Sequence, residues 1–298
     1  MRILFVYSSS LRPRGFAFQV MNHVGCVDCI DMGAYVNFDD SKYDGLIYSP
    51  TAFECKWSEL SNRYRVAYPY LPEIDEKYHN FKGKKLLFDT RDDENSDGFG
   101  RFNDPTIPRM KSTPSYEFMK NFNVIIPMAR PVHSVLVDNG PDTKAIPLLY
   151  CCKMNGYSGV PFPTNIRHTV YDKLMPFNPY TTRTRDTVAY CNALRSAKIS
   201  VVVPGYGLIT KSHSEALAAG AVMFSHETVK EIKLLPFTEL VDGENYVSFN
   251  LDNLEEKLKY LLNDEDRIKV ISENGRKAFV EGYRPDKVAT QILEYFNG

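Results

Sequence analysis

The sequence predicts an α/β protein built from two Rossmann-like domains. Short apolar runs alternate with stretches of helix-forming residues, which is the pattern of a parallel, doubly wound sheet. The 298 residues are enough for two such domains of about 150 residues each. Between the halves lies a polar segment with four turn-forming residues, Pro131, Gly140, Pro141 and Pro147. We therefore expect domains at residues 1–140 and 141–284, followed by a terminal helix at 285–298 that crosses back to the first domain.

Apolar and β-branched runs predict the strands of the first half. They fall at residues 3–7, 27–32, 45–48, 85–88 and 122–126. In the second half, strands are expected at 148–151 and 199–203, and helices at 164 onwards, 186–197, 211–219, 254–262, 264–279 and 285–296. Pro285 suits the first turn of the last helix, where its missing N–H is not needed.

The segment 199–222 combines a strand, a glycine turn, a cation and an acid. The strand at 199–203 is followed by Gly205 and Gly207, which allow a sharp turn and the close approach of a ligand. The helix expected at 211–219 would present its free N–H groups and the Lys211 ammonium to a pyrophosphate. Glu215, one turn further on, can accept two hydrogen bonds from a ribose diol. Each of these residues alone fits an ordinary turn or a solvated helix face, but their order favours a nucleotide-sugar site.

This segment resembles the carboxy-terminal half of GT-B glycosyltransferases, close to the family 1 and family 4 types and to the CgeB-like and exostosin-like groups. In those proteins a strand runs into Gly-x-Gly, then a basic residue, Glu-Ala, a small residue, Gly and an apolar strand. The resemblance continues through residues 237–249 and the helices after them, covers about residues 185–298 well, and covers the first half weakly. One departure is Lys211, where many relatives have arginine, so the contact is a point charge rather than a bidentate fork.

The resemblance implies a GT-B fold, in which two Rossmann-like domains face each other across a cleft, and a nucleotide-sugar donor bound by the second domain. A UDP- or GDP-sugar would be the co-substrate, with no tightly bound cofactor, and Lys or Arg side chains would neutralise the leaving group without a metal. The implied donor-binding residues are Gly205, Tyr206, Gly207, Lys211, Ser212, Glu215, Arg167, Arg183 and Arg185. The three arginines are secondary candidates, since most arginines lie on the surface.

The acceptor and the general base are expected from the first domain. Asp89, Asp92 and Asp93 follow the strand at 85–88, so they lie at its carboxyl end, where doubly wound sheets bind ligands. Inverting sugar transfer needs a base to take the acceptor proton, and one of these carboxylates can do so, with Arg91 orienting its neighbour. Arg12 and Arg14, after the first strand, suit an anionic acceptor or a phosphate. A solvated acidic turn that caps the next element is the alternative interpretation.

Composition narrows the class of protein. With 43% hydrophobic residues, 24% charged residues and a formal net charge of -1, the chain has no bulk bias toward nucleic acid or membranes. It contains neither a signal peptide pattern nor an apolar run of about 18 residues, so no membrane span is expected. The six cysteines are scattered, which indicates reduced thiols and a cytoplasmic location. Cys26 and Cys29 have the spacing of a redox motif or half a zinc site, but no second Cys or His pair follows and the histidines are not paired, so no metal is expected.

The leading hypothesis is a glycosyltransferase that moves a sugar from a nucleotide sugar to a hydroxyl acceptor, a glycan or glycoprotein. One alternative is a DNA glycosyltransferase acting on hydroxymethylated bases, because the first half has clustered basic residues: Arg12, Arg14, Arg63, Arg65, Lys82, Lys84 and Lys85. A second is a non-catalytic nucleotide- or sugar-binding module. A NAD-dependent Rossmann enzyme fits less well, because Ser8, Ser9 and Ser10 follow the first strand instead of a Gly-x-Gly-x-x-Gly turn.

Overall fold

The computed structural model describes residues 1–7, 16–49, 72–89, 104–130, 132–154, 165–181, 186–205 and 208–298. The chain divides into two compact units. Unit 1 contains Met1–Met128 and Arg284–Gly298, and unit 2 contains Ala129–Tyr283. The division falls earlier than residue 140 because helix α5 (Ser134–Asn139) packs on helices α7 (Thr187–Arg195) and α8 (Lys211–Ala218) of unit 2.

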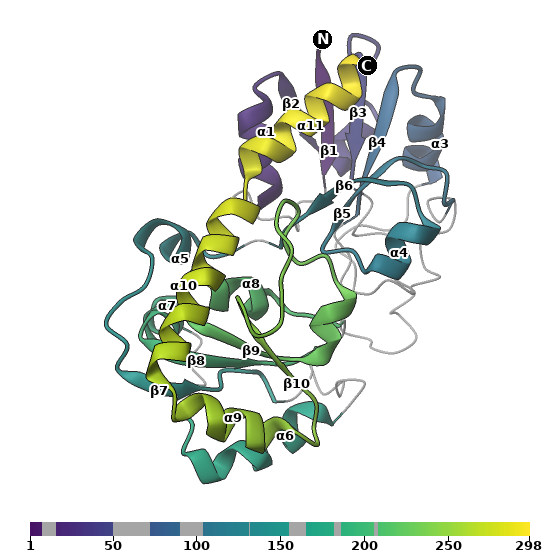
Figure 1. Ribbon diagram of the computed structural model, residues 1–298. Helices are drawn as coiled ribbons and strands as arrows, with labels where there is room; N and C mark the ends of the chain where they lie inside the picture. The colour runs from purple at the N-terminus through teal and green to yellow at the C-terminus, as the bar shows by residue number, and fades with distance from the viewer. Residues whose placement is uncertain are drawn as a thin grey trace. The chain divides into compact units, whose positions relative to one another are not determined.

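Unit 1 is a parallel sheet covered by helices (Figure 1). Its strands are β1 (Ile3–Tyr7), β2 (Val27–Asp31), β3 (Gly45–Tyr48), β4 (Lys84–Asp89), β5 (Arg109–Ser112) and β6 (Val124–Met128). They pair in the order β2-β1-β3-β4-β5-β6. The helices described in this unit are α1 (Phe16–Val24), α2 (Met32–Tyr35), α3 (Pro72–Asn80), α4 (Tyr116–Asn121) and α11 (Pro285–Asn297).

The terminal helix α11 packs against α1 and β6 in unit 1. Its Phe296 ring lies against Gly45, where a β-carbon would come within 2.6 Å of the ring. A glycine at this point of β3 therefore lets the helix lie close to the sheet.

Strand β5 was not expected from the sequence, because its side chains alternate between charged and uncharged types. Arg109 and Lys111 are 0% and 1% exposed. The Arg109 guanidinium lies 4.5 Å from the Phe122 ring centre and donates to the Asp104 carbonyl oxygen at 2.7 Å. Buried cations are retained in proteins where such partners replace water, so a hydrophobic pattern does not reveal this strand.

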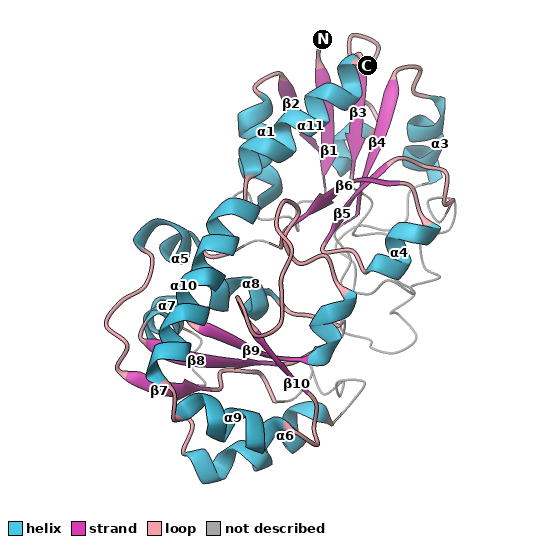
Figure 2. Ribbon diagram, viewed as in Figure 1, coloured by secondary structure: helices cyan, strands magenta, loops and turns pink. Residues whose placement is uncertain are grey.

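Unit 2 contains a second parallel sheet between two layers of helices (Figure 2). Strands β7 (Ile146–Leu149), β8 (Ala197–Val202), β9 (Val222–His226) and β10 (Val247–Phe249) pair in the order β10-β9-β8-β7. Helices α8 and α10 (Glu265–Gly282) pack together over one face, and α6 (Ile166–Leu174) and α9 (Leu254–Leu262) lie together on the other. The short 3-10 helices are Met175–Phe177 and Glu227–Glu231.

Helix α8 ends in the glycine motif that the sequence predicted. Gly220 has φ +63°, its N–H donates to the Leu217 carbonyl, and the Ala221 N–H donates to the Ala216 carbonyl. This pair of bonds is the Schellman arrangement, which satisfies carbonyl groups that a helix end leaves open.

Helix α10 lies close to α8 and to the segment before β10 at Gly275. A β-carbon at Gly275 would come within 3.1 Å of Leu217 Cδ2 on α8 and within 2.7 Å of the Asn245 carbonyl oxygen. The adjacent Arg276 guanidinium donates to the carbonyl oxygens of Leu136, Val137 and Ala218, and so ties α10 to the ends of α5 and α8. None of the helices that the structure describes is both long enough and apolar enough to cross a membrane.

Candidate functional site

The candidate site lies where β8 leads into α8. A β-carbon at Gly205 would come within 2.9 Å of Arg167 Nη2 and 3.1 Å of Thr210 Cγ2, so only glycine fits here without displacement. The other two residues of the predicted turn, Tyr206 and Gly207, lie outside the described residues. The helix then begins at Lys211, as the sequence predicted.

The amino end of α8 is capped by a histidine. The His213 Nδ1 atom lies 3.1 Å from both the Thr210 backbone nitrogen and the Thr210 carbonyl oxygen, so the ring is hydrogen-bonded to the backbone of Thr210. Burial lowers the pKa of His213 to about 3, and the nearby Arg130, Arg167 and His226 also favour the neutral form, whereas the Thr210 carbonyl oxygen, 3.1 Å from Nδ1, favours the charged form. Arg130 and Arg167 therefore lie near enough to the first turn of α8 to act on its electrostatics, and together with Lys211 they favour an anion there.

Glu215 is held by two side chains that reach it from different directions. Its carboxylate is 1% exposed, and Oε1 lies 3.4 Å from Nζ of Lys211, which is 62% exposed. The Tyr190 hydroxyl, from α7, donates to Oε2 at 2.9 Å and lies 3.5 Å from Ser212 Oγ. Burial, and then the Glu215 carboxylate, raise the pKa of Tyr190 well above its ordinary value, so the phenol stays protonated as the donor.

Sequence reasoning placed Lys211, Ser212 and Glu215 at this site, and the structure brings these three residues together. Sequence reasoning did not find Tyr190, the fourth residue at this site. The lysine and the glutamate are four residues apart on one helix, a spacing that is visible in the sequence. Tyr190 comes from another helix, and no local spacing marks that contact.

Arg167 connects two loops at the ends of strands. It is 6% exposed, its Nε donates to the Pro204 carbonyl at 2.9 Å, and its Nη1 donates to the Lys153 carbonyl at 2.5 Å. The residue thus fixes the loop after β8 to the segment after β7. The structure gives Arg167 a role in holding the turn, whereas the sequence assigned it only to the donor. Arg183 and Arg185 lie outside the described residues.

Of the acceptor-side residues, Asp89 is described. It ends β4, is 0% exposed, and its Oδ1 lies 3.6 Å from Nζ of Lys111 on the neighbouring strand. The Asp89 carboxylate is therefore half of a buried ion pair, not the open side chain that a solvated acidic turn would have. The other predicted acceptor-side residues, Asp92, Asp93, Arg91, Arg12 and Arg14, lie outside the described residues.

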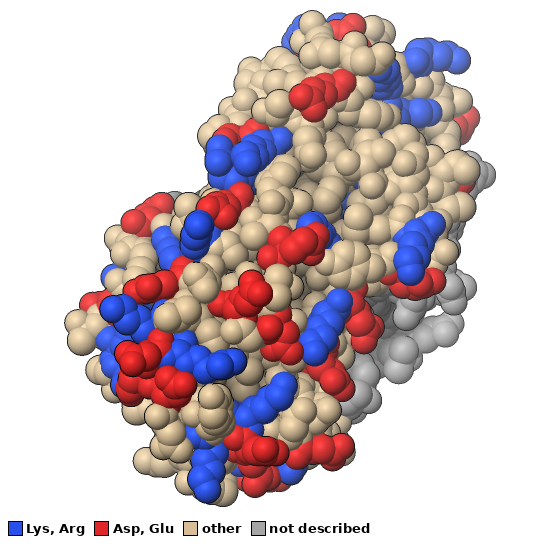
Figure 3. Space-filling view, viewed as in Figure 1, with Lys and Arg blue, Asp and Glu red and all other residues tan. Residues whose placement is uncertain are grey.

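The basic residues considered for nucleic acid binding divide into two groups. Lys84 and Lys85 are at the amino end of β4, and their ammonium groups donate to the carbonyl oxygens of Tyr295 and His79. Lys82, just before that strand, is exposed. Arg12, Arg14, Arg63 and Arg65 lie outside the described residues. On the face in Figure 3, acidic and basic side chains are interspersed over unit 2, which is not the one-sign surface that a polyanion needs.

The cysteines within the described ranges are free thiols: Cys26, Cys29, Cys151, Cys152 and Cys191. Burial and the Glu215 carboxylate raise the pKa of Cys191 to about 11, so this thiol stays protonated and packs as a small apolar side chain. No group of three or more His, Cys, Asp or Glu side chains suited to a metal ion occurs among the residues that the structure describes.

Comparison with known proteins identifies the fold. The fold is that of the GT-B glycosyltransferases, shown by solved structures with low sequence identity. The sucrose-phosphate synthase of Thermosynechococcus elongatus matches with a TM-score of 0.60 and 10% identity over 100% of this chain and 98% of that one. Anabaena HepE, solved with UDP and glucose, matches with a TM-score of 0.57 and 11% identity over 100% of both chains.

An α-glucosyltransferase solved with UDP-glucose and DNA containing an abasic site matches with a TM-score of 0.60 and 9% identity over 100% of both chains. TarM matches with a TM-score of 0.55 and 14% identity, and this chain spans 57% of the TarM chain. No curated protein sequence matches the chain.

Residues 159–294 match the family described as glycosyl transferase-like. This range includes the whole of the motif from Gly205 to Gly220. The predicted GT-B fold is therefore confirmed, and the resemblance of the second half to glycosyltransferases agrees with this family match.

Proposed function

We propose that this protein is a glycosyltransferase that uses a nucleotide sugar and transfers the sugar to a hydroxyl group of a glycan or glycoprotein. The observation that carries the proposal is the arrangement of Gly205, Lys211 and Glu215 at the carboxyl end of β8, in a chain with the GT-B fold. Parallel sheets of this type bind their ligands at that edge.

In the proposed complex the diphosphate lies at the amino end of α8. The Lys211 ammonium, which is exposed, contacts the diphosphate oxygens, and the N–H groups of the first turn add donors. Glu215 accepts from the ribose hydroxyls once the donor displaces the side chains that bury it. UDP is favoured over GDP, because HepE and the α-glucosyltransferase were solved with UDP or UDP-glucose.

The transfer step breaks the bond between the anomeric carbon and the phosphate oxygen, and forms a bond from that carbon to the acceptor oxygen. The nucleoside diphosphate leaves with the bonding electrons, and Lys211 stabilises its additional charge. If the anomeric configuration inverts, a carboxylate takes the acceptor proton, and we assign this role to Asp92 or Asp93. Asp89, buried against Lys111, is assigned to positioning the strand end from which those residues follow.

Titration calorimetry with UDP and with GDP tests the donor site. Lys211→Ala and Glu215→Ala are expected to weaken binding of the preferred nucleotide at least tenfold, since a hydrogen bond to a charged group contributes about 1.5–3 kcal/mol. Lys277→Ala and Glu281→Ala are matched controls, because this pair has the same i, i+4 spacing on α10, at 4.0 Å. The assignment would be contradicted if Lys211→Ala and Glu215→Ala bound the nucleotide as tightly as the two control variants do.

A DNA glycosyltransferase is the second candidate, favoured by the match to the α-glucosyltransferase solved with DNA. The ammonium groups of Lys84 and Lys85 are already hydrogen-bonded to carbonyl oxygens, which does not favour a role for them in binding DNA. A DNA enzyme would bind duplex DNA with an affinity that falls steeply with salt, whereas a glycan enzyme would show no such binding. A non-catalytic module would bind UDP yet neither transfer nor hydrolyse the sugar.

A further inference from the structure

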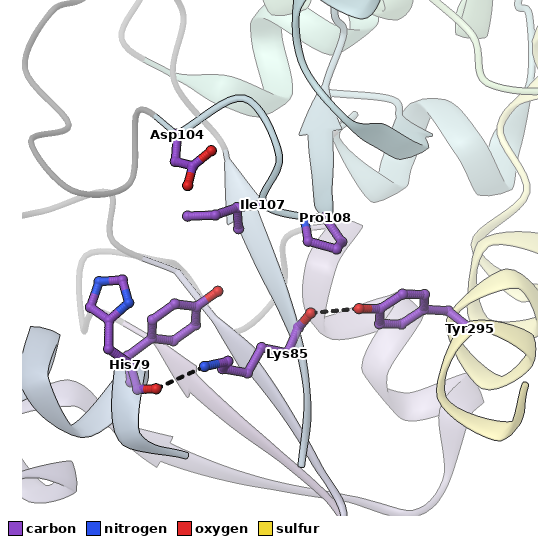
Figure 4. A pocket seen from close by; sticks show the side chains of 7 residues that line it. His79, Lys85, Asp104, Ile107, Pro108 and Tyr295 are labelled. Atoms are coloured by element: carbon purple, nitrogen blue, oxygen red, sulfur yellow. Dashed lines mark hydrogen bonds between the residues drawn. The ribbon is translucent and has the colours of Figure 1, made fainter. Parts of the chain in front are cut away.

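Unit 1 contains a cavity of about 300 Å³ (Figure 4). Its wall is formed by helix α3, strand β4, the segment before β5, and the terminal helix α11. The described residues that line it are Tyr78, His79, Lys85, Asp104, Ile107, Pro108 and Tyr295.

The cavity lies at the amino edge of the sheet. Lys85 is the second residue of β4, and Pro108 directly precedes β5. Asp89 ends β4 at the opposite edge, about 13 Å further along the strand at 3.3 Å per residue. The ligands of a doubly wound sheet bind at the carboxyl edge, so this cavity is separate from the transfer site.

Hydrogen bonds fix the walls of the cavity. The Tyr295 hydroxyl donates to the Lys85 carbonyl at 2.7 Å, and Lys85 Nζ donates to the His79 carbonyl at 2.9 Å. Lys84 Nζ donates back to the Tyr295 carbonyl at 3.1 Å. These bonds join three elements that are distant in sequence, and a preformed cavity binds without the cost of ordering its walls.

One acceptor in the wall is available to a ligand. Asp104 Oδ1 accepts from the Thr106 N–H at 2.8 Å and from the Thr106 hydroxyl at 2.7 Å, which holds the carboxylate in place. No donor from the described part of the chain reaches Oδ2. The hydrogen bonds with Thr106 lower the pKa of Asp104, so the carboxylate is ionised and can only accept.

The remaining wall combines a cation with ring and apolar surfaces. Lys85 Nζ lies 5.4 Å from the Tyr78 ring centre, and Ile107 and Pro108 face the same space. The Lys85 ammonium and the Asp104 carboxylate offset each other in charge beside the His79 ring, so the lining is not a cluster of cations that would select a phosphate. A ligand with hydroxyl donors and apolar C–H faces fits this lining.

We propose that this cavity binds a neutral sugar unit of the acceptor. A volume of about 300 Å³ is at the lower end of small-molecule pockets, so it admits a ring or two and no longer chain. The assignment of the sugar to the acceptor rests on the proposed function. A second contact remote from the reacting hydroxyl raises the effective concentration of a polymeric acceptor at the transfer site.

Saturation-transfer NMR with the full chain tests the proposal. The probes are glucose, galactose, mannose, N-acetylglucosamine and their disaccharides, each at millimolar concentration. At least one is expected to bind, and Asp104→Asn, which keeps the shape but removes the charge, is expected to weaken that binding about tenfold. Asp138→Asn, an exposed carboxamide substitution on α5 of unit 2, is the control.

Tyr295→Phe provides a second variant, because it removes the hydroxyl that fixes the wall and keeps the ring. It is expected to weaken the same probe, with Tyr260→Phe, an exposed tyrosine in unit 2, as its control. Failure of every probe to bind would overturn the proposal. Binding by the Asp104 and Tyr295 variants that is as tight as binding by the original chain would also overturn it. UDP affinity measured on the same samples reports on the donor site alone, so loss of the proposed function would be seen separately.

Discussion

The Tyr190 hydroxyl on α7 donates to Oε2 of Glu215 on α8 at 2.9 Å. The phenol keeps a nearly inaccessible carboxylate hydrogen-bonded, and so leaves its other oxygen beside Lys211. Tyr190 is therefore a positioning residue for the two charged groups assigned to the nucleotide.

Tyr190→Phe should lower both stability and nucleotide affinity. It leaves Glu215 Oε2 buried without a donor, which costs about 1–3 kcal/mol in the free energy of unfolding. Urea denaturation and UDP calorimetry measure the two effects, and Tyr260→Phe, 60% exposed, is the control. If Tyr190→Phe has the same unfolding free energy and the same UDP affinity as the original chain, this hydrogen bond does not organise the site.

His213 should make the fold sensitive to acid. Its folded pKa of about 3 lies below the ordinary value of 6.5, so the unfolded chain binds the extra proton between these values and stability falls as the pH falls. From pH 7 to pH 5 this group should cost about 2 kcal/mol of unfolding free energy. Comparing His213→Asn with the original chain over that range isolates the contribution. Parallel stability profiles for the two proteins would contradict the neutral, buried histidine.

The buried pair of Asp89 and Lys111 should tolerate joint removal better than the loss of one partner. Lys111→Met leaves a carboxylate that is 0% exposed without its cation, and breaking such a pair typically costs about 3–5 kcal/mol. Adding Asp89→Asn removes the remaining charge and should restore part of the loss. The measurement is a double-mutant cycle in urea. Additive effects of the two substitutions would mean that the side chains are not energetically coupled.

Gly220→Ala should destabilise unit 2 more than Gly25→Ala destabilises unit 1. Both glycines have positive φ, +63° and +72°, and a left-handed conformation costs a non-glycine residue about 1–2 kcal/mol. A β-carbon at Gly220 would also come within 3.1 Å of Pro141, whereas at Gly25 it would meet nothing within 4 Å. The melting temperatures of the two variants separate the cost of the positive φ, which both share, from the cost of the contact with Pro141, which only Gly220→Ala has. A larger loss for Gly25→Ala would contradict the packing at the end of α8.

The strands with apolar runs could be predicted closely from the sequence. Residues 3–7 and 45–48 were expected as strands and form β1 and β3 with the same bounds. The motif from Gly205 to Gly220 was also visible, because its residues lie on one turn and one helix, where spacing determines neighbours. Strand β5 could not be found in this way, because Arg109 and Lys111 are buried through partners from other elements.

Contacts between distant segments were likewise hidden. Nothing in the order of residues joins Tyr190 to Glu215, or Tyr295 to Lys85, because each contact is made by the packing of separate elements. The sequence also placed Arg167 among donor-binding residues by its charge, while its contacts with the Pro204 and Lys153 carbonyls depend on how two loops meet.

The most direct test of the central claim is release of the nucleoside diphosphate from a panel of UDP- and GDP-sugars, measured with and without glycan acceptors. We expect one donor to be consumed, faster with an acceptor present, and Lys211→Ala to slow the reaction at least tenfold while Lys277→Ala does not. Binding of the nucleotide without turnover of any donor would contradict a transferase and favour the binding module. Turnover that Lys211→Ala leaves unchanged would place the donor elsewhere in the protein.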